Sequence, residues 1–176
     1  DTAWNLVGSA SRAGVTAYLE GRRAQRFNTI GILLFRDTGP NAHGAEPFHR
    51  NADGRADLSR PRIAPDTNTA SPADYDYWDH VDFVFSEARR LGLNLLVLPY
   101  WGSNVTGGHD GTPDHELLLT PENAYHYAQW VGARYREAPN VLWLHGANRP
   151  PEFPERQLDF RPTIARLAEG LADGLN

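Results

Sequence analysis

Eight residues, Asn28-Thr29-Ile30-Gly31-Ile32-Leu33-Leu34-Phe35, form an almost continuously apolar run. A strand that is covered on both faces in a parallel sheet has this texture. Residues 93–100 and 140–146 have a similar length and texture, and Gly or Pro bounds both of them. The sequence therefore predicts three buried parallel strands.

A stretch with helical periodicity precedes each of these strands, and a fourth follows the last one. Ser11 is a suitable N-cap for the first helix, and the second spans about 73–91. Thr120 caps the third, with Pro121 at its first position, and the fourth covers about 159–175. This alternation of helices and strands predicts an α/β fold with a parallel sheet.

The loops that follow the strands are long, whereas the turns that precede them are short. Residues 36–72 and 101–120 are rich in Gly, Pro, Asn, Asp and His. Loops longer than about 12–15 residues are uncommon in compact domains unless they are functional or disordered. Both leave the carboxyl ends of strands, where parallel α/β proteins place their active sites, so we expect a binding surface there.

The sequence favours a barrel over a doubly wound sheet. No G-x-G-x-x-G turn follows the first strand, and the absence of Lys excludes a P-loop. A complete (β/α)8 barrel takes ~250 residues. We therefore expect a partial (β/α)8 TIM barrel with about the first four β/α units, the first strand lying mostly before Asp1. Residues 1–176 are then the amino-terminal half of one barrel domain.

Composition and charge argue against several classes of function. The net charge of -5 gives no basic footprint for nucleic acid, and no apolar run is long enough to span a membrane. Cysteine is absent, so the sequence does not indicate a compartment. Asn104-Val105-Thr106 matches a glycosylation acceptor, a short pattern that often arises by chance.

The histidines do not predict a metal site, and no cofactor is expected. His115-Glu116 begins a zinc-protease pattern, but Leu119 stands where the second His is needed. His80 and His126 fall within predicted helices, where hydrogen-bonded structural or surface roles are more common.

Polar and aromatic residues gather just beyond the predicted strand ends. Flat aromatic faces pack against sugar rings while polar side chains bond the hydroxyls, so this set suits carbohydrate recognition. Trp143 lies within a strand and is interpreted as a core residue. The set comprises Asp1, Thr2, Trp4, Asn41, His43, Phe48, Tyr100, Trp101, Asn104, Asn148 and Arg149.

Many short motifs in this chain occur in the order typical of one family. The sequence resembles the apiosidase-like glycoside hydrolases (the family 140 type, also catalogued as domain of unknown function 4038) over essentially its whole length. The motifs are Asp1-Thr2-Ala3-Trp4, Tyr18-Leu19 with Arg22, Phe27-Asn28-Thr29-Ile30, Pro40-Asn41-Ala42 with Gly44 and Pro47-Phe48, Tyr77-Trp78 with His80-Val81-Asp82, Leu91-Gly92-Leu93, Trp101-Gly102, Thr120-Pro121-Glu122-Asn123-Ala124, and Pro139-Asn140-Val141 with Trp143.

The resemblance implies a (β/α)8 barrel that hydrolyses glycosidic bonds, with apiose in plant pectin side chains as the characterised type of substrate. It also implies a carboxylic acid after the fourth strand and a carboxylate on a later strand. Where the family commonly reads Gly-Gly-Asp-Arg-Asn-Pro, this chain has an amide, Asn148, at the Asp position. The candidate substitutes for the acid are Glu152 and Glu155 on the same loop, and Asp110, Asp114 and His115 on the neighbouring loop.

The chain stops at Asn176, before the strand expected to carry the second carboxylate. The resemblance therefore implies an O-glycosyl hydrolase family and leaves the activity of these residues alone open. The uncovered inner face of such a half barrel would need the missing half or self-association to bury it.

Three hypotheses follow. In the first, the chain is a glycoside hydrolase fragment in which Asp1, Trp4, Asn41, His43, Trp101 and Arg149 contact saccharide and Asn148 occupies the acid's position. The second is a non-catalytic carbohydrate-binding relative that has lost its acid. The third, less favoured, is a metal-dependent sugar isomerase on the same barrel, since no His and carboxylate set clusters at the strand ends.

Overall fold

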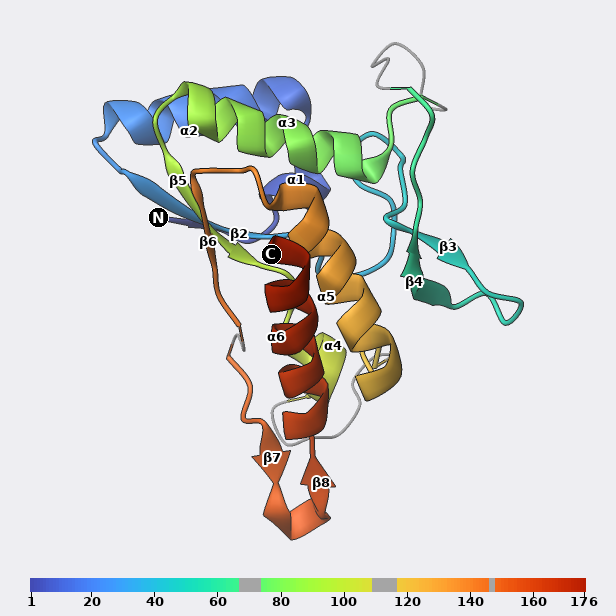
Figure 1. Ribbon diagram of the computed structural model, residues 1–176. Coiled ribbons are helices and arrows are strands. Elements are labelled where there is room, and N and C mark those ends of the chain that lie inside the picture. Colours follow the sequence, from blue (N-terminus) through green and yellow to red (C-terminus); the bar gives the residue numbers. More distant parts are fainter. Residues whose placement is uncertain (67–73, 109–116, 146–147) are drawn as a thin grey trace.

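The fold is an α/β arrangement with one parallel sheet and helices on one of its faces (Figure 1). The computed structural model describes residues 1–66, 74–108, 117–145 and 148–176. Its elements in chain order are β1 (Thr2–Ala3), α1 (Leu6–Ser9), α2 (Arg12–Ala24), β2 (Thr29–Leu33), β3 (Phe48–Arg50), β4 (Ala56–Pro61), α3 (Tyr77–Arg90), β5 (Asn94–Leu98), α4 (Ser103–Thr106), α5 (Pro121–Tyr135), β6 (Val141–Trp143), β7 (Glu152–Phe153), the 3-10 turn η1 (Pro154–Arg156), β8 (Leu158–Asp159) and α6 (Arg161–Leu175).

The main sheet has the strand order β1-β2-β5-β6, and every neighbouring pair is parallel. The three apolar runs form β2, β5 and β6, which confirms the three parallel strands. Strand β2 and most of β5 are buried as predicted, whereas β6 is only partly covered. In register, Gly31 lies beside Leu96, and Leu96 beside Leu142. All four carboxyl ends therefore meet at one edge of the sheet, which is the edge where the long loops emerge.

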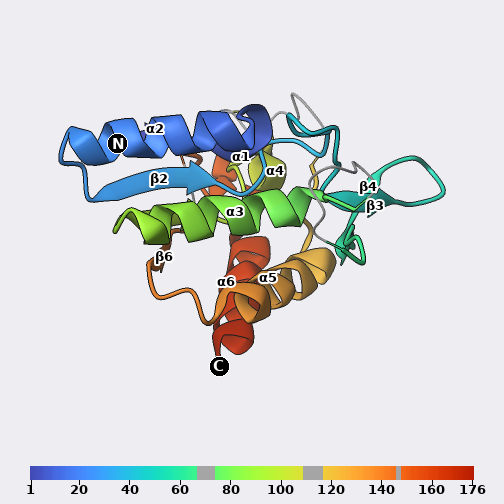
Figure 2. The same ribbon diagram turned by 90° about the horizontal axis from the view of Figure 1, so that it is seen from above.

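Helices α2, α3 and α5 bury their apolar sides against the sheet, and Figure 2 shows α2 and α3 side by side over β2. Val15 and Leu19 of α2 are fully buried, as are Trp78 and Val81 of α3. These side chains recur at spacings of three and four, so they form one stripe on each helix. Apolar burial of this kind is the main force that holds the helices on the sheet.

Helix α6 packs along α5 at very short range because glycines lie at the contact. A Cβ atom at Gly170 would lie 2.2 Å from the Tyr125 carbonyl oxygen, and one at Gly174 would lie 2.2 Å from that of Gln129. Any side chain at these two positions would push the helices apart. The two glycines therefore set the distance between the helix backbones.

The helix starts follow the capping signals in the sequence. The Ser11 hydroxyl accepts the Gly14 amide at 3.2 Å, and Thr120 forms a capping box with Asn123 at the start of α5. Helix α3 begins at Tyr77, later than the predicted start near 73, because Asp76 accepts the amides of Trp78 and Asp79. A carboxylate at this position satisfies amides that have no partner within the helix.

The loops contain short elements that the sequence analysis missed. The antiparallel hairpin of β3 and β4 lies within residues 36–72, and helix α4 lies within residues 101–120. A second hairpin, β7 and β8, follows residue 148 and projects away from the main sheet (Figure 1). In the described part of the chain, no helix combines the length and apolar character needed to cross a membrane.

Strand β6 has one covered and one uncovered face. Val141 and Trp143 pack against the core, which confirms the interpretation of Trp143. Leu142 and Leu144 point the other way and are 55% and 39% exposed. The face of the sheet opposite the helices is therefore apolar and open to solvent at β6.

Candidate functional site

A hollow of about 370 Å³ lies beyond the carboxyl ends of the main strands. We call it the Trp4–Trp101 hollow, and its lining residues are Trp4, Leu98, Trp101, Leu144, His145 and Asn148. They come from the last residue of β5 and from the segments that follow β1, β5 and β6. The parallel sheet thus brings together Trp4, Trp101 and Asn148, three of the residues expected from the sequence.

Two half-buried indole rings form the aromatic walls of the hollow. The ring centroids of Trp4 and Trp101 are 6.0 Å apart, and the ring planes are inclined at 53°. A Cβ atom at Gly31 would lie 3.1 Å from the Trp4 ring, so this glycine in β2 makes room for the indole. The inclined rings leave apolar faces directed at a common space, which suits a flat ligand with apolar faces.

Two buried tyrosines hold the strand ends from which the site residues emerge. The Tyr77 hydroxyl of α3 donates to the Leu34 carbonyl at 2.8 Å, and the Tyr127 hydroxyl of α5 donates to the Pro99 carbonyl. Burial raises the pKa of both phenols well above the usual value, so both stay protonated and act as donors. Each helix is therefore bonded to the carboxyl end of one strand of the main sheet.

Asn148 lines the hollow, whereas Arg149, also expected there, does not line it and instead bonds Asn148. Asn148 is exposed, and its Oδ1 accepts a hydrogen bond from Nη1 of Arg149 at 3.3 Å. Nε of Arg149 donates to the Gly107 carbonyl at 3.3 Å, at the end of α4. The guanidinium thus fixes the amide oxygen of Asn148 and links its loop to the turn that follows Trp101.

His145 lines the hollow but was not selected from the sequence. Burial lowers the pKa of its imidazole, so the ring is neutral at pH 7. Its Nδ1 is buried and has no hydrogen-bond partner among the described residues. In the sequence, His145 lies inside an apolar run. Only its position at the carboxyl end of that run indicates a residue of the site.

Asp1 does not lie at the hollow, contrary to its expected place on the saccharide rim. Its carboxylate accepts hydrogen bonds from the Tyr18 hydroxyl at 2.8 Å and from Nε of Arg22, both on α2. Its ammonium group donates to the carbonyl of Thr29, the first residue of β2. Three residues of extended chain span about 10 Å, so Asp1 lies toward the amino end of the sheet while Trp4 reaches the carboxyl end.

Asn41 and His43 are also placed apart from the hollow. Oδ1 of Asn41 accepts the backbone amides of His43 and Ala45 at 2.9 and 3.2 Å, which folds residues 41–45 into a tight turn. The turn directs His43 against His80 of α3, with ring centroids 4.6 Å apart, and against Tyr75 at 5.0 Å. Both residues were expected on the rim, yet neither lines the Trp4–Trp101 hollow.

His80 confirms the structural role expected for it. The ring is fully buried, and its Nδ1 lies 3.0 Å from the Tyr75 hydroxyl. Burial, together with His43 and Arg12, lowers the pKa of His80 to about 4, against the opposing effect of the Ala10 carbonyl. Burial and Arg12 lower the pKa of His43 as well. His126 is exposed on α5, also as expected.

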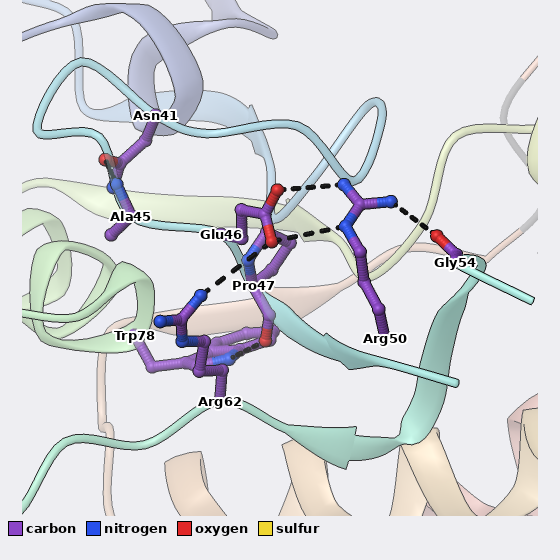
Figure 3. A network of polar contacts seen from close by, with 8 residues as sticks. All are labelled: Asn41, Ala45, Glu46, Pro47, Arg50, Gly54, Arg62 and Trp78. Carbon is purple, nitrogen blue, oxygen red and sulfur yellow. Dashed lines mark hydrogen bonds and ion pairs between the residues drawn. The ribbon is translucent and has the colours of Figure 1, made fainter. Parts of the chain in front are cut away.

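A smaller hollow of about 260 Å³ lies beside the β3–β4 hairpin, and Glu46 is one of its lining residues. Figure 3 shows the Glu46 carboxylate between Arg50, at 2.8 Å, and Arg62, at 3.8 Å. The hydrogen bond from Arg50 is the main cause of the lowered pKa of Glu46. This carboxyl is ionised and occupied by arginines, so it is unsuited to donate a proton.

The groups considered as substitutes for the missing acid fall into two sets. Glu152 of β7 lies 3.2 Å from a guanidinium nitrogen of Arg161, and Glu155 is exposed on η1. Neither lines the Trp4–Trp101 hollow. Asp110, Asp114 and the His115-Glu116 pair lie outside the described residues. Within residues 1–66, 74–108, 117–145 and 148–176, no three His, Asp or Glu side chains are placed to hold a metal ion.

Comparison with solved structures shows that the chain shares its fold with glycoside hydrolases. One structure described as a glycoside hydrolase superposes with a TM-score of 0.74 at 21% identity, over 97% of this chain and 33% of that chain. A glycoside hydrolase family 5 structure from Bacteroides vulgatus gives a TM-score of 0.71 at 19% identity, over 97% and 32%. The chain therefore spans about a third of the length of these structures.

The family model described as "Apiosidase-like, catalytic domain" matches residues 1–176. The chain belongs to this family, which confirms the resemblance seen in the sequence. The family is one of hydrolases, and the chain is a glycoside hydrolase-like catalytic-domain fragment. Comparison with curated protein sequences gave no match.

Proposed function

We propose that residues 1–176 form the amino-terminal half of a (β/α)8 barrel whose carboxyl-end hollow binds a plant-type saccharide such as an apiose-containing pectin side chain. The observation that carries this proposal is the Trp4–Trp101 hollow at the shared carboxyl edge of four parallel strands. Strands that neighbour one another in chain order support a barrel over a doubly wound sheet, whose order reverses.

The uncovered side chains of β6 support the same architecture. Leu142 and Leu144 are apolar, exposed and directed away from the helices. In a closed barrel such inward side chains are packed by those of the other strands. The missing half of the barrel, or a second copy of the chain, covers this face in the proposal.

Two kinds of side chain recognise the sugar in this proposal: aromatic rings that pack on it and polar groups that bond its hydroxyls. Trp4 and Trp101 pack on the apolar faces of the sugar, while His145, Asn148 and Arg149 bond hydroxyl groups at the entrance. Asp1, Asn41 and His43 take supporting roles away from the sugar, because the Asp1 carboxylate bonds Tyr18, Oδ1 of Asn41 accepts the His43 amide, and the His43 ring packs against His80. The partner is a carbohydrate, with no nucleic acid, membrane or cofactor in the reaction.

The chemistry depends on what stands at the position of the family's acid. Glycoside hydrolysis requires one carboxyl that protonates the leaving oxygen and a second carboxylate that acts from the opposite face of the sugar. The Asn148 amide donates hydrogen bonds but does not transfer a proton as an acid does. General acid catalysis contributes about 10²–10⁴-fold, so we propose that Asn148 limits turnover rather than binding.

Replacement of the amide tests this proposal in the full-length protein. Asn148→Asp is expected to raise turnover of aryl glycosides and pectic oligosaccharides by about tenfold or more, as a carboxyl restores part of the acid's contribution. Asn148→Ser, which lacks a titrating group, is the matched control and is expected to give no gain. Unchanged turnover of Asn148→Asp, with saccharide still bound, would instead assign the chain to a non-catalytic carbohydrate-binding protein.

Binding is tested separately from turnover by titration calorimetry with an apiose-containing pectic oligosaccharide. Trp101→Ala removes one wall and is expected to weaken affinity by about tenfold or more. Trp143→Ala is the control, because Trp143 packs on the opposite side of the sheet and its loss should lower stability without changing Kd. Equal affinities of wild type and Trp101→Ala would contradict a saccharide site in this hollow.

A further inference from the structure

Asn104 is a fully buried amide on α4 that bonds two loops with one side chain. Its Oδ1 accepts the backbone amide of Trp101 at 2.9 Å. Its Nδ2 donates to the carbonyl of Arg36 at 3.0 Å, in the loop that follows β2. The side chain thus connects the ends of two neighbouring strands at the edge of the hollow.

The backbone of Asn104 makes a third connection. Its carbonyl oxygen accepts the amides of Leu118 and Leu119 at 2.9 and 3.0 Å, in the segment that leads into α5. Three separate segments therefore converge on this residue: the one after β2, the one after β5 and the one before α5. With hydrogen bonds on every side, Asn104 has no freedom to move independently of these segments.

Helix α4 also supports the other side of the hollow. Arg149 donates to the carbonyl of Gly107, the residue that ends α4, and the same guanidinium bonds Asn148. A displacement of α4 would therefore move Trp101 at its amino end and Asn148 and Arg149 at its carboxyl end. The helix is the common support of both sides.

We infer that Asn104 is a positioning residue that fixes Trp101 against Trp4, and through α4 fixes the Asn148 loop, so that the hollow is formed before the saccharide arrives. This inference rests on the proposed function. The geometry requires an amide, because one short side chain must accept from Trp101 and donate to Arg36. An aspartate presents an acceptor to the Arg36 carbonyl, and an alanine leaves both buried backbone groups unpaired.

Burial of Asn104 also changes the interpretation of the Asn104-Val105-Thr106 pattern. A glycosylation acceptor must be exposed on the folded surface, whereas Asn104, Val105 and Thr106 are all buried. The asparagine and the threonine instead belong to the hydrogen-bonded structure of α4, where the Thr106 hydroxyl donates to the Gly102 carbonyl at 3.4 Å.

The test is calorimetric titration of the full-length protein with an apiose-containing pectic oligosaccharide, for wild type, Asn104→Ala and Asn104→Asp. If the loop that carries Trp101 is held loosely, every folded molecule binds more weakly and Kd rises. If the variant is partly unfolded, only the number of binding sites falls and Kd stays the same. We expect Asn104→Ala to raise Kd by about tenfold at unchanged stoichiometry. Asn104→Asp, which keeps the bond from Trp101, should raise Kd by a smaller factor.

Asn140→Ala is the matched control. Nδ2 of Asn140 donates to the Leu93 carbonyl at 3.1 Å, so it also joins two segments, but at the amino end of the sheet. We expect it to lower Tm and leave Kd unchanged. If Asn104→Ala does not fold, Asn104→Ser takes its place, because a hydroxyl partly fills the space and retains hydrogen-bonding capacity.

The double variant Asn104→Ala with Trp101→Ala separates the inference from the proposed function. Because part of the effect of Asn104 acts through Trp101, Asn104→Ala should weaken binding by a smaller factor in the Trp101→Ala background than in wild type, and the remaining factor reports the Asn148 loop. A normal Kd for Asn104→Ala, beside a raised Kd for Trp101→Ala, would overturn the positioning role and leave the proposed function standing. A normal Kd for Trp101→Ala would overturn both.

Discussion

The indole rings of Trp4 and Trp101 face the same space at an inclination of 53°, with their centroids 6.0 Å apart. One ring follows β1 and the other follows β5, and Gly31 of the intervening strand leaves room for Trp4. Three neighbouring strands thus cooperate to place two aromatic faces. Because neither ring forms the hollow alone, their contributions to binding should be linked.

A double-mutant cycle tests this linkage. We expect Trp4→Ala and Trp101→Ala each to weaken pectic oligosaccharide affinity by about tenfold or more. The Kd of the double variant should rise by less than the product of the two single-variant factors. Once one indole is removed, the sugar is no longer held between two rings, so removal of the second indole costs less. Calorimetric Kd values of the four proteins give the answer, and strictly multiplicative losses would indicate two independent contacts.

Acid should destabilise the fold through the buried histidine pair. The pKa of His80 is about 4 in the folded chain, against an ordinary value of 6.5 for the unfolded chain. Below pH 6.5 the unfolded state binds the proton first, so stability falls as the pH drops from about 6.5 to about 4 and this loss levels off below that. The full shift corresponds to about 3 kcal/mol.

Urea unfolding of wild type and His80→Gln between pH 7.5 and pH 4 measures this effect. The variant lacks the titrating ring, so its free energy of unfolding should depend less steeply on pH over that window. Equal slopes for the two proteins would show that other groups cause the acid sensitivity.

The hydroxyl of Tyr77 should contribute measurably to stability. Tyr77→Phe leaves the buried Leu34 carbonyl without its side-chain partner, and we expect a loss of about 1–3 kcal/mol in unfolding free energy. Tyr125→Phe is the control, because the Tyr125 hydroxyl donates to Asp173 at the exposed surface and its removal should change stability by less than about 0.5 kcal/mol. Chemical denaturation of both variants compares them directly.

Two glycine-to-alanine changes should have opposite signs. At Gly174 the new Cβ would meet the Gln129 carbonyl oxygen at 2.2 Å, so Gly174→Ala should destabilise by about 1–3 kcal/mol. At Gly21, within α2, nothing lies within 4 Å, so Gly21→Ala should stabilise by about 0.5–1 kcal/mol through helix propensity. Thermal and urea unfolding report both, and a neutral or stabilising effect of Gly174→Ala would contradict the close α5–α6 contact.

His145 should titrate below the ordinary histidine range. Burial lowers the pKa of its imidazole, so the ring gains a proton at a lower pH than an ordinary histidine does. If saccharide binding depends on the neutral ring, its affinity should be unchanged just below pH 6.5 and should decline only at the lower pH where His145 becomes protonated. Proton NMR titration of the ring, assigned with His145→Gln, locates the midpoint, and a midpoint at or above 6.5 would contradict the buried placement.

Much of the fold could be predicted because its signals are local. The apolar runs gave β2, β5 and β6, and the caps Ser11 and Thr120 placed two helix starts. The elements that were missed, such as α4 and the two hairpins, are only two to six residues long. Periodicity cannot be recognised over so few residues, and their position depends on contacts with distant segments.

The site could be predicted only as far as strand order determines it. Trp4, Trp101 and Asn148 line one hollow, since carboxyl ends of parallel strands share an edge. Asn41 and His43 also follow a strand, but the turn organised by Asn41 directs His43 toward α3. The direction of a side chain after the strand end depends on such turns, which the sequence pattern does not specify.

The contact between His43 and His80 shares no residue with the Trp4–Trp101 hollow. The loss of stability in acid that this pair causes is therefore separate from the ligand hollow, where His145 has its own response to pH. An engineer who wants a form of this protein that stays folded at low pH can redesign the histidine pair and keep the aromatic walls as they are.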